Sequence, residues 1–318
     1  MRWLGVDGGG TKTTFSVFDE HMNQVATNNL PTCHIGQVGE EGMRDVLRSG
    51  IDWAVRDGCL GEAWGIGFGL AGYGNEHHSR ASIESVCESV SNGHPYVLMS
   101  DLKAGCVAAL GLEDGVVIVA GTGSAALGMR GGRELRCGGW GFQIGDEGSG
   151  WWMGRRLLEA FSRESDGRRP QGAVHRLVRE HLSLENDYDL IALRRTTLAG
   201  RTEVAALAPL VFEAAADGDK EARRILNDAA VSDAEMAATI VSELFSDDPE
   251  VRTSYIGGTF RGGNGAILDL LRAGLLPQTC KLVPPAYGPD AGACLVLRDS
   301  IGRGGNDACH RPYERYEP

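Results

Sequence analysis

Two glycine-rich turns, Asp7-Gly8-Gly9-Gly10-Thr11-Lys12 and Gly121-Thr122-Gly123-Ser124, decide the fold of this chain. The first turn follows the apolar run Trp3-Leu4-Gly5-Val6 and leads into residues 11–18, which are rich in β-branched and aromatic side chains. Both flanking runs are typical of strands. In P-loop and dinucleotide-binding motifs the glycines instead open a helix. The first turn therefore predicts another kind of phosphate-binding loop, in which a strand follows the glycines.

The second turn has the same layout. Residues 115–120 predict a buried strand and residues 125–129 a second strand, with the glycine–threonine turn between them. Two such units, one opening each half of the chain, predict duplicated domains that face one nucleotide from both sides. Glycine lets backbone N–H groups approach phosphate oxygens, and Thr and Ser hydroxyls add donors. Either turn alone could be an ordinary hairpin, but the repetition favours a phosphate site.

The remaining pattern predicts an α/β fold with a helical insertion. Residues 64–70 and 96–99 are strand candidates with a helical stretch near residues 80–90 between them, which predicts parallel strands joined by crossover helices. Residues 174–245 carry strong helix formers and belong to the second half. The tail at residues 303–318 is polar and lacks periodicity, so we expect it to be flexible.

Composition narrows the class of function. The 318 residues are 42% hydrophobic and 23% charged, which predicts two globular domains. A formal net charge of −12 without a basic block argues against a nucleic-acid partner. There is no apolar run of about 18 residues to span a membrane, and the N-terminus leads into a strand and not into a signal peptide. We therefore expect a cytoplasmic protein.

The eight cysteines are scattered singly, with no Cys-x-x-Cys pair and no Cys/His spacing suited to zinc. Isolated cysteines of this kind behave as small buried hydrophobes, and the cytosol keeps thiols reduced. We expect free thiols and no metal or iron–sulfur cluster held by cysteine.

Five motifs follow one another along the chain. They are the first turn, Ser100-Asp101-Leu102-Lys103-Ala104-Gly105, the second turn, the segment from Gly138-Gly139-Trp140-Gly141 to Gly145-Asp146-Glu147-Gly148-Ser149, and Ile256-Gly257-Gly258-Thr259. Each glycine turn is common, but the fourth motif is specific. In this order, and over nearly the whole chain except the tail, they resemble the BadF/BadG/BcrA/BcrD-type ATPase family, and within it the N-acetylglucosamine kinases.

This resemblance implies duplicated ribonuclease H-like (actin-like ATPase) α/β domains with a cleft between them, where ATP and a sugar meet. We expect the N-terminal domain at residues 1–111, joined by a C-terminal helix at about residues 290–302. The C-terminal domain would cover residues 112–289 and contain the helical insertion. The activity implied is ATP-dependent phosphorylation of an amino sugar, N-acetylglucosamine or glucosamine, on the carbon-6 hydroxyl.

Asp101 is the candidate catalytic base. It lies at the end of a predicted strand and the start of a predicted helix at residues 102–110, which is where α/β folds place ligands. Phosphoryl transfer needs positioning and charge stabilisation, with one group to accept the hydroxyl proton. The alternative is that Asp101 only caps this helix, and the resemblance favours the catalytic role.

The resemblance also implies a nucleotide site. Asp7 would place Mg²⁺, mainly through water. Lys12 could add charge near the phosphates or be a solvated hairpin residue, and the later glycines could form ordinary tight turns. The candidate ATP-binding residues are Gly9, Gly10, Thr11 and Lys12 from the first turn, Gly121, Thr122 and Gly123 around the γ-phosphate, and Gly257, Gly258 and Gly262 at the adenosine.

The same resemblance places Asp146 on sugar hydroxyls, with Glu147 beside it and the backbone of Gly139, Trp140 and Gly141 nearby. The two carboxylates could instead complement the N-terminus of a predicted helix at residues 149–161, and Trp140 could be packed core.

One segment departs from the family pattern. Thr32-Cys33-His34 stands where the sugar kinases of this family often have Thr-Asn-His, with the Asn on the sugar. Cysteine lacks the donor and acceptor pair of an amide. Cys33 and His34 are therefore the candidate sugar contacts of this segment, and Cys33 offers the sugar weaker hydrogen bonds than the family's Asn would.

Two other functions compete with the kinase. The second branch of the family activates radical dehydratases and holds an iron–sulfur cluster through cysteines beside the second phosphate loop, but residues 119–124 contain none. A sugar-sensing regulator with a decayed site is disfavoured by the intact Asp101. We expect a small-molecule sugar as partner, without nucleic acid or membrane; a homodimer and the identity of the amino sugar stay open.

Overall fold

The computed structural model describes residues 1–57, 60–74, 77–275, 279–303 and 310–312. The chain forms two compact units. Unit 1 comprises Met1–Glu113 together with Pro284–Pro318, and unit 2 comprises Asp114–Val283. The chain thus leaves unit 1, builds unit 2 and returns to unit 1.

The strands of unit 1 form one sheet, in the order β11-β5-β4-β1-β2-β3. They are β1 (Arg2–Gly8), β2 (Lys12–Phe18), β3 (Gln24–Pro31), β4 (Trp64–Leu70), β5 (Tyr96–Ser100) and β11 (His310–Pro312). β1, β2 and β3 form an antiparallel meander, while β4 runs parallel to β1 and β5 parallel to β4. This pattern confirms the parallel portion predicted from the sequence.

The sheet of unit 2 repeats that of unit 1. Its strands are β6 (Gly115–Ala120), β7 (Ser124–Arg130), β8 (Arg133–Gly138), β9 (Val251–Ile256) and β10 (Cys280–Leu282), in the order β10-β9-β6-β7-β8. β6 to β8 form an antiparallel meander, and β9 and β10 are parallel additions to β6. The duplication predicted from the two turns is therefore confirmed strand by strand. One detail differs, because Asp7 lies inside β1 and not in the turn.

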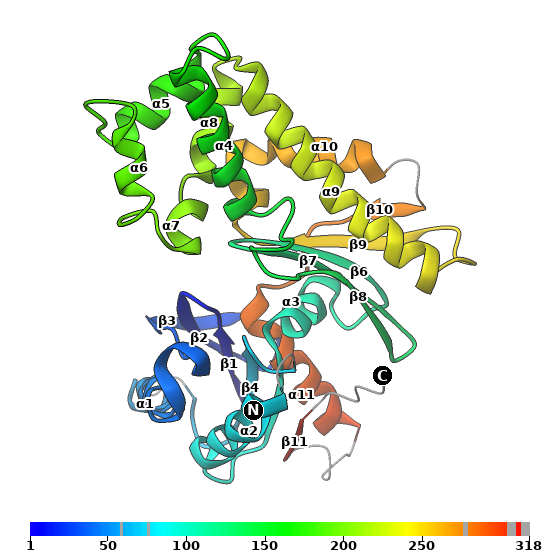
Figure 1. Ribbon diagram of the computed structural model, residues 1–318. Helices are drawn as coiled ribbons and strands as arrows, with labels where there is room; N and C mark the ends of the chain where they lie inside the picture. The colour runs from blue at the N-terminus through cyan, green and yellow to red at the C-terminus, as the bar shows by residue number, and fades with distance from the viewer. Residues whose placement is uncertain (58–59, 75–76, 276–278, 304–309, 313–318) are drawn as a thin grey trace. The chain divides into compact units, whose positions relative to one another are not determined.

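Helices flank both sheets (Figure 1). Unit 1 contains α1 (Ile35–Arg56), α2 (His77–Ser91), α3 (Asp101–Leu110), the 3-10 helix η2 (Pro289–Ala291) and α11 (Gly292–Gly302). Unit 2 contains α4 (Gly150–Ser165), α5 (Ala173–His181), α6 (Asp189–Leu193), α7 (Arg201–Ala205), α8 (Ala208–Ala216), α9 (Lys220–Leu244), the 3-10 helix η1 (Gly258–Gly265) and α10 (Ala266–Leu275). The predicted helical insertion is confirmed by α5 to α9.

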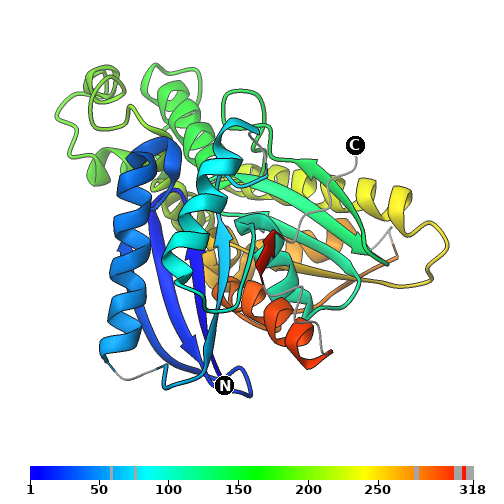
Figure 2. The ribbon, with the colours of Figure 1, turned by 90° about the horizontal axis from the view of Figure 1, so that it is seen from below.

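Glycines occupy the middle of one face of the unit 1 sheet, on β1 and β4. Successive strand residues point to opposite faces, and Gly5 of β1 and Gly67 and Gly69 of β4 share one face. A Cβ on Gly67 would lie 2.4 Å from the backbone nitrogen of Cys294, and one on Gly69 would lie 2.6 Å from the Cβ of Ala104. The missing side chains let α3 and α11 pack directly on this face, whereas α1 and α2 cover the other (Figure 2).

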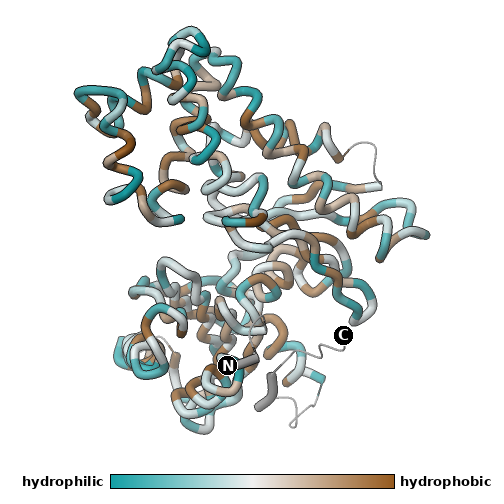
Figure 3. Tube along the Cα trace, viewed as in Figure 1, coloured by the Kyte–Doolittle hydropathy of each residue, from teal (hydrophilic) through white to brown (hydrophobic). Residues whose placement is uncertain are grey.

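In unit 2, α9 crosses the sheet over β6, β7 and β8. Gly128 of β7 permits this close packing, because a Cβ there would lie 2.3 Å from Cγ2 of Ile240. Hydrophobic and hydrophilic residues alternate along α9 (Figure 3), as expected for a helix with one buried face. Asp219 caps this helix by accepting bonds from the N–H groups of Glu221 and Ala222 at 2.9 and 3.1 Å.

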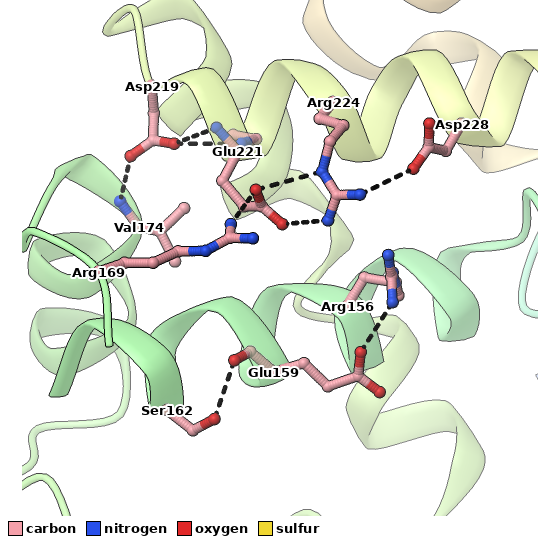
Figure 4. Close-up of polar contacts among 10 residues, drawn as sticks. Arg156, Glu159, Ser162, Arg169, Val174, Asp219, Glu221, Arg224 and Asp228 are labelled. Atoms are coloured by element: carbon pink, nitrogen blue, oxygen red, sulfur yellow. Dashed lines mark hydrogen bonds and ion pairs between the residues drawn. The ribbon is translucent and has the colours of Figure 1, made fainter. Parts of the chain in front are cut away.

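A polar network ties the start of α9 to the segment that follows α4 (Figure 4). Glu221 pairs with Arg169 and with Arg224, and Asp219 also accepts a bond from the N–H of Val174 at 3.2 Å. Glu221 is more enclosed than its two arginine partners, with 15% of its side chain exposed. The network thus links the segment after α4, the start of α5 and the start of α9.

The C-terminal segment, Pro284–Pro318, belongs to unit 1. The predicted helix at about residues 290–302 forms η2 and α11. In the tail, His310–Pro312 form β11 and pair in parallel with β5. The prediction of a flexible tail did not include this strand. The remainder of the tail, residues 304–309 and 313–318, lies outside the described residues. None of the described cysteines, 33, 87, 106, 137, 280 and 294, forms a disulfide bond with another described residue.

Candidate functional site

The first part of the site lies where the parallel strands of unit 1 end. Asp7 is the penultimate residue of β1, and Asp101 directly follows β5 as the first residue of α3. Oγ of Ser100 accepts the N–H of Lys103 at 3.2 Å, so Ser100 is the N-cap of α3 and the capping alternative for Asp101 is wrong. One carboxylate oxygen of Asp101 accepts the N–H of Leu102 at 2.9 Å.

Asp7 lies close to other carboxylates. Burial, followed by the charges of Asp101 and Asp290, raises the pKa of Asp7 to about 7, against an opposing effect of Lys12. A cation would offset this repulsion, and Mg²⁺ prefers carboxylate oxygens while it keeps several waters. Within the described ranges, no group of three His, Cys, Asp or Glu side chains could hold a metal ion. A magnesium ion at Asp7 would therefore take its remaining ligands from water or a bound phosphate.

Hydrogen bonds close the first turn and attach it to the segment that follows β3. The N–H of Gly9 donates to the carbonyl of Lys12 at 3.0 Å. The carbonyl of Gly9 accepts the hydroxyl of Thr32, and that of Gly10 accepts Nε2 of Gln37, both at 2.8 Å. Gly10, Thr11 and Lys12 are exposed. Nζ of Lys12 donates to Oδ1 of Asn29 at 3.3 Å, as an ordinary hairpin lysine would.

The segment that departs from the family pattern turns its thiol inward. Cys33 is 2% exposed, and a Cβ on Gly8 would lie 2.7 Å from its Sγ. Burial raises the pKa of this thiol. The N–H of Cys33 donates to Oγ1 of Thr13 at 2.9 Å. His34 is the N-cap of α1, and its Nδ1 accepts the N–H of Gly36 at 3.2 Å. Both candidate sugar contacts therefore have structural tasks in this segment.

Cys33→Asn is expected to destabilise the protein and not to tighten sugar binding. The amide is larger than the thiol and would enter a packed site; overpacking and an unsatisfied amide each cost about 1 to 3 kcal/mol. Denaturant unfolding measures the loss, and Cys33→Ala, which adds no volume and no polar group, is the matched control with a smaller loss. An Asn variant with unchanged stability and a lower KM for an amino sugar would show that this side chain meets the ligand.

The second turn is tied to the start of α4. The N–H of Gly121 donates to the carbonyl of Gly123 at 2.8 Å, which closes the turn between β6 and β7. The carbonyls of Gly121 and Thr122 accept the N–H groups of Gly150 and Trp151 at 2.7 and 3.3 Å. These N–H groups belong to the first turn of a helix, which has no acceptors of its own for them. The second turn, which is predicted to bind phosphate, therefore also satisfies N–H groups at the start of α4.

Asp146 lies beside this turn. It is 3% exposed, and its Oδ2 lies 2.6 Å from Nη2 of Arg201. A Cβ on Gly123 would lie 2.9 Å from the same oxygen. The backbone of Asp146 has φ 62°, a left-handed conformation that is uncommon outside glycine and worth noting at a candidate site. The neighbouring Glu147 is exposed, so the two adjacent carboxylates have different environments.

The N-terminus of α4 does not use the Asp146 carboxylate as its cap. Ser149 is the N-cap, and its Oγ accepts the N–H of Trp152 at 3.1 Å. The carboxylate of Asp146 is instead paired with Arg201. The side-chain cap of α4 therefore comes from Ser149 and not from Asp146.

The loop that precedes Asp146 exposes its aromatic residue. Trp140 is 76% exposed, so the alternative that it is packed core is wrong. Gly139 and Gly141 on either side have φ of 73° and 88°, in the left-handed region that favours glycine. Nη2 of Arg136 donates to the carbonyl of Gly139 at 2.6 Å. The glycines thus let the loop turn sharply and present Trp140 outward.

The third group of glycines in unit 2 lies at the end of β9, next to β6. Gly257 has φ 122°, and a Cβ there would lie 2.0 Å from the carbonyl oxygen of Ala120, so only glycine fits. The hydroxyl of Thr259 donates to the same oxygen at 2.6 Å. A Cβ on Gly262 would meet the ring of Phe212 at 2.5 Å, whereas Gly258 faces open space. Gly257 therefore lies beside the residue that precedes the second turn.

Sequence reasoning missed three charged residues that the structure brings to these sites. Arg201 contacts Asp146 from the helical insertion, and Asp290 contributes its charge to the surroundings of Asp7. Asp233 of α9 is fully buried, and a Cβ on Gly148 would lie 2.5 Å from its Oδ1. None belongs to a short motif, so only the packing of distant segments reveals them.

The two matching sheets, each with a glycine turn between its first two strands, define an α/β protein with a duplicated core. The chain belongs to the BadF/BadG/BcrA/BcrD ATPase family, whose model matches residues 4–295. This confirms the family that the five motifs indicated. Among the described residues, no helix combines the length and the apolar character that crossing a bilayer requires.

Similar proteins cover almost the whole chain. The N-acetyl-D-glucosamine kinase of Dictyostelium discoideum is 28% identical over 313 residues, which span 94% of this chain and 98% of the relative. The N-acetylmuramic acid/N-acetylglucosamine kinase of Clostridium acetobutylicum is 27% identical over 266 residues, 82% of this chain and 86% of the relative. The crystal structure of a candidate N-acetylglucosamine kinase from Chromobacterium violaceum has a TM-score of 0.73 and 27% identity, covering 93% of this chain and 98% of that one. The predicted actin-like ATPase fold is confirmed.

Proposed function

We propose that this protein is an ATP-dependent kinase that phosphorylates an amino sugar on its carbon-6 hydroxyl, with N-acetylglucosamine as the first candidate and glucosamine as the second. Membership of an ATPase family supports the use of ATP. The relatives named as N-acetylglucosamine kinases support an amino sugar as acceptor. ATP supply and the free thiols are consistent with action in the cytoplasm.

The contact between the second turn and Asp146 carries this proposal. A sugar kinase must hold a phosphate and a sugar hydroxyl within reach of each other, because positioning accounts for much of phosphoryl transfer. In unit 2, a Cβ on Gly123 would lie only 2.9 Å from the Asp146 carboxylate. The glycine turn offers backbone donors to a phosphate, and the carboxylate offers acceptors to sugar hydroxyls. Both kinds of group are thus built into one place.

The chemical step needs one base. Asp101 would accept the proton of the carbon-6 hydroxyl while the oxygen of that hydroxyl forms a bond to the γ-phosphorus. The bond between this phosphorus and the bridging oxygen of ADP breaks, and ADP leaves with that electron pair. Asp7, whose pKa is raised by burial and by the charge of Asp101, would offer a carboxylate to Mg²⁺, which neutralises charge on the phosphates when it is bound.

Asp146→Ala is expected to weaken binding of the sugar by about 1.5 to 3 kcal/mol, the usual contribution of hydrogen bonds to a charged group, and to change ATP affinity much less. Isothermal titration calorimetry with each ligand measures the two effects. Glu147→Ala is the matched control, because that neighbouring carboxylate is exposed, and its effect on sugar binding should be smaller. Equal losses for both ligands in Asp146→Ala would remove Asp146 from the sugar site.

A further inference from the structure

Arg201 is the cation that the fold places against the second turn. It is the first residue of α7, and its side chain is 37% exposed. Nη2 pairs with Oδ2 of Asp146 at 2.6 Å and would lie only 1.8 Å from a Cβ on Gly123. The guanidinium thus touches the backbone of the turn as well as the buried carboxylate. A side chain at Gly123 would exclude it from this position.

The pair with Asp146 uses only part of the guanidinium. Arginine carries five N–H donors in a planar fork, and in the part of the chain that the structure describes Arg201 donates a hydrogen bond only through Nη2. Nε of Arg201 is buried and has no hydrogen-bond partner among the described residues. Its guanidinium carbon also lies 5.9 Å from the centre of the Phe142 ring. The side chain is therefore held at the turn with donors still to be satisfied.

A phosphate is the ligand that this arrangement suits. Charge spreads over the oxygens of the transferred phosphoryl group in the transition state, and arginine matches phosphate with paired N–H bonds. Glycine and threonine backbone in the second turn supplies no positive charge of its own. The net charge of −12 makes a local cation more important for binding an anion.

We infer that Arg201 is a further catalytic residue, which keeps one nitrogen on Asp146 and uses its remaining donors on the phosphoryl group during transfer. This inference rests on the proposed kinase function. Arg201 would form no covalent bond and move no proton. Its guanidinium would contact both the Asp146 carboxylate, which holds the sugar, and the phosphoryl group, which is transferred to the sugar. Binding of the two substrates would in this way be linked through one side chain.

The test compares Arg201→Gln with Arg155→Gln, since Arg155 is an exposed arginine of α4 in the same unit that pairs with Glu159. Arg201→Gln is expected to lower kcat by about 10²- to 10³-fold, the usual cost of removing one donor to a transition-state oxyanion, with the KM for ATP within about threefold. Arg155→Gln should leave kcat unchanged. The ratio of kcat with ATP to kcat with ATPγS is a second readout. This ratio should be larger for the wild type than for Arg201→Gln if Arg201 contacts the phosphoryl oxygens, and equal for the two if Arg201 is only structural.

A kcat within about threefold of the wild type, or an unchanged sulfur effect, would overturn the inference. So would a rise in the KM for the sugar alone, which would leave Arg201 as a positioning residue for Asp146. If circular dichroism shows that Arg201→Gln does not fold, Arg201→Lys replaces it; this variant keeps the charge but loses the paired contact and should lose at least about tenfold in kcat. If the wild type makes sugar phosphate and Arg201→Gln is equally active, only the catalytic role of Arg201 is contradicted. If the wild type makes no sugar phosphate, the proposed kinase function itself is contradicted.

Discussion

Asp101→Asn is expected to lose about 10²- to 10⁴-fold in kcat, the usual contribution of general base catalysis. The amide keeps the shape of the carboxylate and its position at the start of α3 but cannot accept the proton of the sugar hydroxyl. Asp101 also raises the pKa of Asp7, so ATP affinity should be compared at pH 8, where Asp7 is largely ionised in both proteins. Under these conditions the affinity for ATP should change little.

Glu41→Gln is the matched control for this loss, since it makes the same change of carboxylate to amide at an exposed position of α1. Its turnover should equal that of the wild type. Steady-state kinetics with a coupled ADP-release assay measures both variants. Near-normal turnover of Asp101→Asn would remove Asp101 from the mechanism, and an equal loss in Glu41→Gln would show that the effect is not specific to the site.

Asp233→Asn is expected to stabilise the protein, and more so as the pH rises. Asp233 is 0% exposed, and neither carboxylate oxygen has a hydrogen-bond partner among the described residues. Burial raises its pKa well above the ordinary value. A group with a raised folded-state pKa gives its full stability below the unfolded-state pKa and loses it as the pH rises toward the folded-state value. The wild type should therefore lose about 1.4 kcal/mol per pH unit relative to the Asn variant across this range.

Denaturant unfolding at several values between pH 5 and pH 8, on the order of one unit apart, measures this difference. Asp228→Asn on the same helix is the control, because Asp228 is partly exposed and lies 3.7 Å from Arg224. Its difference from the wild type should not grow with pH in this range. A flat difference for Asp233→Asn would mean that Asp233 stays ionised in the folded protein, paired with a group that approaches Gly148.

The duplicated sheets were predictable because their signals are local. Alternating apolar and β-branched residues on both sides of a glycine turn specify a hairpin within a short stretch of chain, and that stretch occurs at residues 3–18 and again at residues 115–129. The helical insertion was equally predictable from the helix formers at residues 174–245, where the structure has α5 to α9. Each of these features depends on neighbours in sequence.

The electrostatics of the site could not be predicted in this way. Arg201 reaches Asp146 across 55 positions of sequence, and in the sequence nothing separates Asp233 from the partly exposed Asp228 of the same helix. The inward direction of the Cys33 thiol depends on how the chain leaves β3 beneath Gly8. Packing between distant segments decides all three, and no motif records it.

The most direct test of the proposed function is a coupled ADP-release assay of the wild-type protein with N-acetylglucosamine, glucosamine, N-acetylmuramic acid, glucose and no sugar, with products identified by mass and NMR. We expect ADP release to require an amino sugar, with kcat/KM at least about tenfold above that for glucose, because a site built for a polar substituent rejects sugars that lack it. The product should carry phosphate on carbon 6. ADP release at the same rate without any sugar, or equal use of glucose, would contradict the assignment of this protein as an amino-sugar kinase.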